Sequence, residues 1–171
     1  MQKQTLKMEI HSFMKVLLAA VNAKYIHSNL AVYSLKSFAS EYGPEIQIAE
    51  YTINQSLDDI LADIYRQKPD ILCFSCYLWN ISYVKQLIVE IKKVLPDTRI
   101  WLGGPEVSYN AVRMLERYPQ LEGIMRGEGE ETFLELLHYY HGLLDKLEDV
   151  RGIVFRRGIS SKAVSYTHLR A

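Results

Sequence analysis

The sequence has 171 residues, enough for one ordinary domain with a core but too few for two large ones. Apolar residues make up 49% and charged residues 23%, a common mix for a soluble globular protein, and the formal net charge of zero argues against a nucleic-acid-binding surface. No apolar run reaches the roughly 20 residues of a membrane span, and two cysteines are too few for a disulfide framework, so we expect a cytoplasmic protein.

Strands and helices are predicted to alternate along the chain, after a poorly patterned leader at residues 1–13. Continuous apolar runs predict strands at residues 16–21, 46–51, 70–75, 99–102 and 123–125. Apolar residues at helical spacing predict helices at residues 30–42, 56–67, 80–95, 107–117 and 130–140. One more strand, at residues 150–156, falls outside this repeat.

Strand–helix units joined by short crossovers predict an α/β fold with a doubly wound, five-stranded parallel sheet, flavodoxin-like in size. We place this domain at residues 14–145. Ligands of such sheets bind at the carboxyl ends of the strands. The loops expected to form a site are therefore residues 22–29, 76–80, 103–108 and 126–130.

The two ends of the chain are expected to lie outside this domain. Residues 146–160 are interpreted as a connector strand toward a further domain. Residues 161–171 include AVSYTHLRA, which follows no pattern of the preceding domain and resembles translated vector sequence, so we expect a non-native tail. On this interpretation the native chain has been cut.

The loop after the first strand carries Asn22, Lys24, Tyr25 and His27. These residues either form a solvated loop or line the ligand crevice, and their position favours the crevice. The loop lacks glycine, which makes it a poor phosphate cradle.

The loop after the third strand, CYLWN, places Tyr77, Leu78 and Trp79 where a strand has just left the core, between Ser75 and Asn80. Large apolar groups are costly when exposed to water. They either cover the core, meet a partner domain, or stack on a flat cofactor.

Glycines end the fourth and fifth strands. Gly103, Gly104 and Pro105 form one turn, and Gly127, Glu128 and Gly129 form the next, where the backbone is left bare for close approach of a ligand. The acidic second turn would repel phosphate.

Other chemistry finds little support. Cys73 and Cys76 match CxxC, but the following helix begins several residues later and no second cysteine pair is present, so a redox or metal role is disfavoured. Ser75 and Asn22 stand where a phosphoacceptor receiver domain needs acidic residues. We expect no catalytic residue and no metal ligand.

The motifs LGGPEVS and RGEGEETF, at this spacing, resemble the N-terminal cobalamin-binding domain of radical SAM proteins, the class that includes the anaerobic magnesium-protoporphyrin IX monomethyl ester cyclase-like proteins. NAKYIHSNLA and SCYLWNI look like a subgroup of that class, and the resemblance covers about residues 14–157.

The resemblance implies a Rossmann-like domain that holds cobalamin across the carboxyl ends of the strands, followed by a barrel whose CxxxCxxC binds an iron–sulfur cluster and S-adenosylmethionine. This sequence has no CxxxCxxC, so the fragment is not expected to be catalytic alone. Its partners would be the corrinoid and the downstream radical SAM domain. Ser75 is similar in place to the serine that meets the nucleotide tail of the cofactor in the wider family. The residues expected at the cofactor are Asn22, Lys24, Tyr25, His27, Ser75, Tyr77, Trp79, Asn80, Gly103, Gly104, Pro105, Gly127, Glu128 and Gly129.

The sequence departs from the related methionine synthase type, which carries DxHxxG with a cobalt-ligating histidine after the first strand. Here His27 stands at a different spacing, so either cobalt has no protein imidazole below it, which we favour, or His27 reaches it by another route. Two alternative functions stay open: a cofactor-free docking domain of the same fold, and a flavin- or nucleotide-binding domain.

Overall fold

The computed structural model describes residues 13–23, 28–157 and 164–166. The strands, in chain order, are β1 Val16–Asn22, β2 Ile46–Thr52, β3 Ile71–Ser75, β4 Arg99–Gly103, β5 Leu121–Met125, β6 Ile153–Arg156 and β7 Val164–Tyr166. The helices are α1 Leu30–Phe38, α2 Leu57–Gln67, α3 Ile81–Val94, α4 Pro105–Ser108, α5 Ala111–Arg117 and α6 Glu130–Tyr140, with 3-10 turns η1 Ser40–Tyr42 and η2 Leu147–Asp149.

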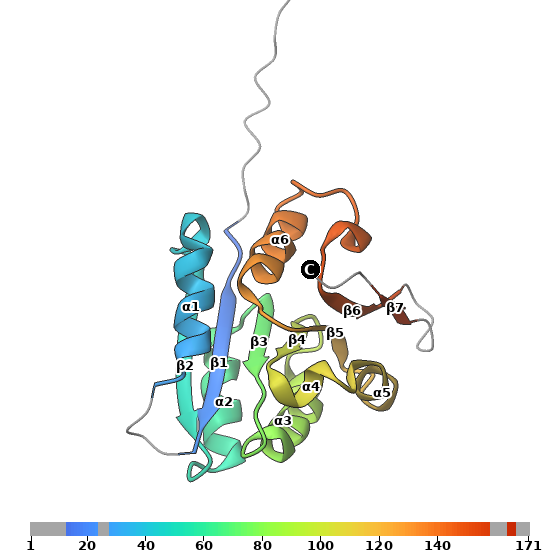
Figure 1. The fold of residues 1–171 in the computed structure, drawn as a ribbon. Helices are drawn as coiled ribbons and strands as arrows, with labels where there is room; N and C mark the ends of the chain where they lie inside the picture. The colour runs from blue at the N-terminus through green and yellow to red at the C-terminus, as the bar shows by residue number, and fades with distance from the viewer. Residues whose placement is uncertain (1–12, 24–27, 158–163, 167–171) are drawn as a thin grey trace, which may run out of the picture.

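All seven of these strands form one sheet, in the order β2-β1-β3-β4-β5-β6-β7 (Figure 1). β1 to β5 pair in parallel, which confirms the predicted doubly wound unit. The predicted total of five strands was too low, because β6 and β7 extend the sheet beyond β5 as antiparallel strands. Apolar patterning predicted the strand at β6 but could not tell which edge it would join.

The chain ends differ in part from the sequence interpretation. Residues 1–12 of the expected leader lie outside the described residues. The expected connector, residues 146–160, contributes η2 and β6, so this part is built into the sheet. Val164–Tyr166 of the expected tail pairs with β6, and the non-native origin of residues 161–171 stays a prediction.

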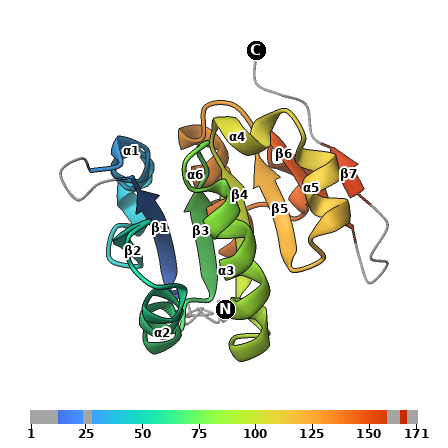
Figure 2. The same ribbon diagram turned by 90° about the horizontal axis from the view of Figure 1, so that it is seen from below.

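Helices cover both faces of the sheet. Figure 2 shows the sheet between α1 and α6 on one side and α2 and α3 on the other. The core is accordingly split into two clusters: one packs α2, α3, α4 and α5 against the sheet, and the other packs α1 and α6. β1 is buried along its whole length, as expected for a central strand covered on both faces.

Local sequence signals account for several element ends. Ser56 caps α2, since its hydroxyl accepts a hydrogen bond from the Asp59 amide at 3.1 Å. Lys68 ends the same helix with φ of 48°. The helix predicted at residues 107–117 is instead two short helices, α4 and α5, which meet at Tyr109 and Asn110. No helix within the described ranges is both long and apolar enough to cross a membrane.

Trp101 packs closely against the backbone of Gly123. They lie next to each other on β4 and β5, and Trp101 is fully buried. A Cβ atom on Gly123 would lie 2.6 Å from Cη2 of the indole ring, and the ring is held by a 2.9 Å hydrogen bond from its Nε1 to the Tyr140 hydroxyl. Position 123 therefore requires glycine, since the indole of Trp101 occupies the space that a side chain would need.

This fit generates a stability prediction. Gly123→Ala is expected to lower the free energy of unfolding by about 1–3 kcal/mol, because the indole cannot move aside without breaking its packing. Urea unfolding measures the loss. Gly103→Ala is the matched control, since its Cβ would make an ordinary 3.7 Å contact with Met125. An unfolding midpoint for Gly123→Ala equal to that of the wild type would contradict this account of the β4–β5 contact.

Candidate functional site

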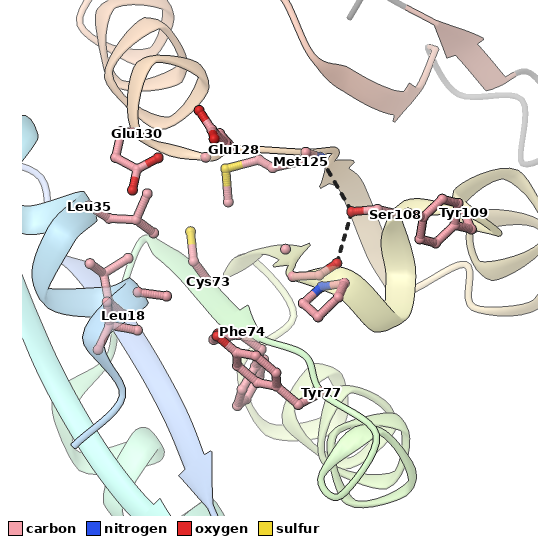
Figure 3. Close-up of a pocket in the computed structure, with 18 residues that line it drawn as sticks. Leu18, Leu35, Cys73, Phe74, Tyr77, Ser108, Tyr109, Met125, Glu128 and Glu130 are labelled. Carbon is pink, nitrogen blue, oxygen red and sulfur yellow. Dashed lines mark hydrogen bonds between the residues drawn. The ribbon is translucent and has the colours of Figure 1, made fainter. Parts of the chain in front are cut away.

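The carboxyl ends of the parallel strands border a cavity of about 450 Å³ between α1 and α6 (Figure 3). Its size is within the range of small-molecule sites, roughly 300–1,000 Å³. Most of the predicted site residues line it, namely Ser75, Tyr77, Gly103, Gly104, Pro105, Gly127, Glu128 and Gly129. The structure therefore brings both glycine turns to one rim of the sheet.

A second cavity, of about 520 Å³, lies beside the first and shares Ala31 and Tyr77 with it. The predicted residues Asn22 and Trp79 line this second cavity. Lys24, Tyr25 and His27 lie outside the described residues, so their place in the site stays a prediction.

The two turns require glycine for different reasons. Gly104 has φ of 106°, and a Cβ there would lie 2.9 Å from the Cys76 amide nitrogen, so its backbone packs directly against the end of β3. Gly127 has φ of 74°, but a Cβ would meet nothing within 4 Å. Gly104 is thus required by packing and conformation, whereas Gly127 is required by conformation alone.

Ser108 joins the two turns. Its hydroxyl donates to the Gly104 carbonyl at 2.9 Å and accepts from the Gly127 amide at 3.4 Å, as the dashed lines in Figure 3 show. The Ser108 carbonyl accepts from Nε of Arg126 at 2.9 Å. These bonds fix the spacing between the turns. Sequence reasoning did not select Ser108, although it ends the LGGPEVS motif.

The inner wall of the cavity is made of carbon and sulfur. Cys73 lies between Leu18 and Leu35 on one side and Met125 on the other (Figure 3). Cys73 and Met125 are each only 3% exposed. Burial raises the pKa of the Cys73 thiol to about 12, so Cys73 is an apolar lining group and not a thiolate nucleophile at neutral pH.

The two cysteines of the CxxC match are packed in the two halves of the core. Cys73 packs in the cluster beneath α1 and α6, whereas Cys76 packs in the cluster beneath α2 and α3. Both thiols are free, and burial also raises the pKa of Cys76. Within the described residues, no group of three or more His, Cys, Asp or Glu side chains is placed to hold a metal ion.

Asn80 was predicted to contact a cofactor, but it lines neither cavity. Its side chain is fully buried and donates to the carbonyls of Val21 at 3.0 Å and Ser75 at 2.8 Å. It also accepts from the Tyr77 amide at 2.8 Å. Asn80 therefore ties the ends of β1 and β3 to the loop that follows β3. Its hydrogen bonds give it a positioning role.

The aromatic loop after β3 does not cover the core. The rings of Tyr77 and Trp79 stack on each other, with centroids 4.5 Å apart and planes 5° apart. Trp79 remains 50% exposed and Leu78 79% exposed. Tyr109, at the outer margin of the cavity beyond Ser108, is 95% exposed (Figure 3). Large aromatic groups that face water thus border both cavities, Tyr109 at the first and Trp79 at the second.

Glu50, at the edge strand β2, organises the start of α1. Its Oε1 accepts from Nδ2 of Asn22 at 3.1 Å and from the Asn29 amide at 2.9 Å, and its Oε2 accepts from the Tyr33 hydroxyl at 2.8 Å. Burial acts to raise the pKa of Glu50, but the hydrogen bonds from Asn29, Tyr33 and Asn22 outweigh it and lower the pKa. Sequence reasoning missed Glu50, because a glutamate in a strand carries no signal of its distant partners.

Asn29 continues this network toward the cavity. Its Oδ1 caps α1 by accepting from the Ala31 amide at 3.1 Å, and its Nδ2 donates to the Ser75 hydroxyl at 3.4 Å. The predicted residue Ser75 is therefore held from the N-terminus of α1.

The described lining of the first cavity carries acidic and neutral side chains only. None of the described residues that line the first cavity is Lys, Arg or His. Glu128 lies at the mouth, and Glu130 accepts a 2.8 Å hydrogen bond from the Ser34 hydroxyl across the gap between α6 and α1. Such a surface binds an uncharged group by shape and apolar contact more readily than a phosphate.

Comparisons with known proteins agree with this geometry. Residues 16–137 match the family model of the B12 binding domain. The chain is 32% identical over 91 residues to the cobalamin-dependent radical SAM methyltransferase TokK of Streptomyces tokunonensis. The matched stretch covers 53% of this chain and 13% of TokK. It is 25% identical over 113 residues to the anaerobic magnesium-protoporphyrin IX monomethyl ester cyclase of Cereibacter sphaeroides, covering 65% of this chain and 18% of the relative.

Among solved structures, the chain resembles the cobalamin-dependent S-adenosylmethionine radical enzyme OxsB with aqua-cobalamin and S-adenosylmethionine bound. The TM-score is 0.75 at 20% identity, over 93% of this chain and 22% of the other. The chain thus spans less than a quarter of each of these proteins.

The Glu50 network generates a pH-dependent prediction. Glu50→Gln is expected to lower the free energy of unfolding at about pH 7. The carboxylate accepts hydrogen bonds from Asn22 and Asn29 on one oxygen and from Tyr33 on the other, whereas an amide has only one oxygen that can accept. The pKa in the folded state is below its ordinary value of 4.5, so the carboxylate stabilises the fold above that pH, and the contribution is lost as the pH falls through the lowered value.

Urea unfolding of both proteins from about pH 7 to about pH 3 measures this difference, which should shrink with acidification. Glu116→Gln, which removes an exposed carboxylate on α5, is the control and should show no such trend. A difference that stayed constant or grew below pH 4.5 would show that the charge of Glu50 does not stabilise the start of α1.

Proposed function

Because the chain belongs to the B12-binding domain family, we propose that it is the cobalamin module of a radical SAM enzyme and positions the corrinoid at the carboxyl edge of its sheet. Cobalamin is the cofactor of this domain. The single observation that carries the positioning is the cavity between α1 and α6, which opens at the rim where both glycine turns meet.

The cavity suits the base of the corrinoid's nucleotide tail, whereas the phosphate of that tail would have to lie outside the acidic lining. A planar base needs a narrow, dry slot beside the sheet, and Leu18, Cys73 and Met125 supply apolar walls for it. Gly103 and Gly127 carry no side chain at the entrance, so the tail can pass the ends of β4 and β5. The residues present therefore fit this part of the cofactor.

The exposed rim suits the corrin ring. Tyr77 and Trp79 offer a stacked aromatic pair, and Tyr109 adds an exposed ring at the margin of the first cavity. A large flat ring laid over this edge would remove these groups from water. The bound corrinoid supplies methyl or electron transfer at its cobalt, while the protein contributes position and limits water access.

We propose that no imidazole of the described chain ligates the cobalt from below. His138 and His141 lie on or just after α6 and pair with Glu41 and Glu45, at 2.9 Å and 3.0 Å. Neither histidine lines the cavity at the carboxyl rim. His27, outside the described residues, is the other route that stays open.

The partner in the whole protein is proposed to be a radical SAM domain that binds an iron–sulfur cluster and S-adenosylmethionine. The radical SAM part of this proposal rests on the relatives, whose names state cobalamin-dependent radical SAM chemistry and of which the chain covers only a part. The iron–sulfur cluster is what the resemblance of the sequence to that class implies. A docking role for the rim is compatible with the same surface, because a second domain seated over the corrin ring would contact Leu78 and Trp79 as well.

Cobalamin binding tests the proposal. Hydroxocobalamin added to the 171-residue chain should bind in equilibrium dialysis and raise the thermal unfolding temperature, since a ligand bound only by the native state stabilises it. Flavin mononucleotide and adenine nucleotides should do neither. No cobalamin retained at about millimolar concentration would overturn the proposal.

Gly103→Val tests the location. The branched side chain would project at the entrance beside Met125, so we expect cobalamin affinity to fall by about tenfold or more. Ala62→Val, which adds the same type of side chain on an exposed position of α2, should bind as the wild type does. Retained affinity in a folded Gly103→Val protein would place the tail elsewhere.

A further inference from the structure

The inner wall of the cavity is apolar, and this bears on which group the cavity can accept. Resting on the proposed function, we infer that the site selects corrinoids by the base of their nucleotide tail, accepting an apolar benzimidazole and discriminating against a purine. The discrimination is carried by Leu18, Cys73 and Met125, which face the cavity with carbon and sulfur alone.

The wall is deep and dry. Leu18 and Val32 are at most 1% exposed, and Cys73 and Met125 are 3% exposed, although each borders the cavity. They come from β1, α1, β3 and β5, so the apolar lining surrounds the space from the sheet and from a helix. Because these four side chains expose almost no surface, water has little contact with this part of the lining.

The polar side chains of the described lining offer few free partners. The Ser108 hydroxyl bonds both to the Gly104 carbonyl and to the Gly127 amide, whereas the Ser75 hydroxyl accepts from Asn29 and keeps one O–H that can donate to a single acceptor. Glu130 accepts from Ser34. Glu128 is exposed. A polar ring edge inserted among Leu18, Cys73 and Met125 would therefore meet few side-chain partners there.

The two base types differ in what they need. Dimethylbenzimidazole presents one free ring nitrogen and two methyl groups. Adenine presents an exocyclic amine and several ring acceptors, each of which loses water on entry. A buried donor or acceptor left without a partner carries its full desolvation penalty, whereas buried methyl groups gain from leaving water. The same wall thus favours the first base and opposes the second.

A comparison of corrinoids that differ only in the tail tests the inference. Cobalamin, the analogue with adenine as its tail base, and cobinamide, which lacks the nucleotide, are each equilibrated with the chain by dialysis, and the corrin absorbance is measured on both sides. We expect the adenine analogue to bind about tenfold or more weakly than cobalamin. Cobinamide should also bind more weakly than cobalamin, because it leaves the cavity unfilled.

The other outcomes separate the two proposals. Equal affinity of cobalamin and the adenine analogue, with weak cobinamide, would overturn the selection while leaving the tail in the cavity. Equal affinity of all the corrinoids would overturn both the selection and the tail site, but not corrinoid binding. Failure of every corrinoid to bind would overturn the proposed function itself.

Two variants of Met125 test whether the apolar lining is responsible for the difference in affinity between cobalamin and the adenine analogue. Met125→Gln adds an amide at nearly constant size and should reduce the ratio of the two affinities by about threefold or more, because it offers a purine a partner. Met125→Leu keeps the wall apolar and should preserve the ratio. An unchanged ratio in a folded Met125→Gln protein would show that Met125 does not face the base.

Discussion

The close approach of the β3 end to the turn after β4 is the constraint on which the site depends. The Cys76 amide donates to the Gly103 carbonyl at 2.7 Å, and Gly104 lies so near Cys76 that no side chain fits. This contact holds the aromatic loop beside the first glycine turn. Ser108 then links that turn to the second one, so the loops of three strands form one connected rim.

The helices that cover the two faces of the sheet bury different numbers of side chains. α3 buries Ile81, Val84, Leu87, Ile88 and Ile91 against its side of the sheet. α1, on the other side, buries Val32 alone among its residues. α6, on the same side as α1, buries Thr132, Phe133, Leu136 and Leu137, and the cavity lies between these two helices beside the bare backbone of Gly103.

Much of this could be predicted from sequence, for physical reasons. Fully apolar strands such as β1 signal burial on both faces, and the alternation with helices then determines parallel order. Because parallel strands end at one edge, Gly103 and Gly127 could be placed together without coordinates. The motif carrying them also indicated the B12-binding family, which the match of residues 16–137 confirms.

What the sequence could not show depends on contacts between distant residues. The bonds of Glu50 to Asn22, Asn29 and Tyr33 join segments that no local pattern relates. Asn80 was expected at the cofactor, but burial turns its amide inward to Val21 and Ser75. The antiparallel pairing of β6 was missed for the same reason, since β6 has a strand pattern whichever neighbour it joins.

The exposed aromatic rim bears on how such a module acts. Leu78 and Trp79 remain in water although the core beneath them is closed, and this exposure is unfavourable unless something covers it. Burial raises the pKa of the Cys73 thiol, in the wall of the cavity, to about 12, so this thiol stays protonated at neutral pH. Under the proposed function, the rim would hold the flat ring of the corrinoid and the cavity would hold the base of its tail. The chemistry would then be that of the bound cofactor, and the role of the chain would be to position it.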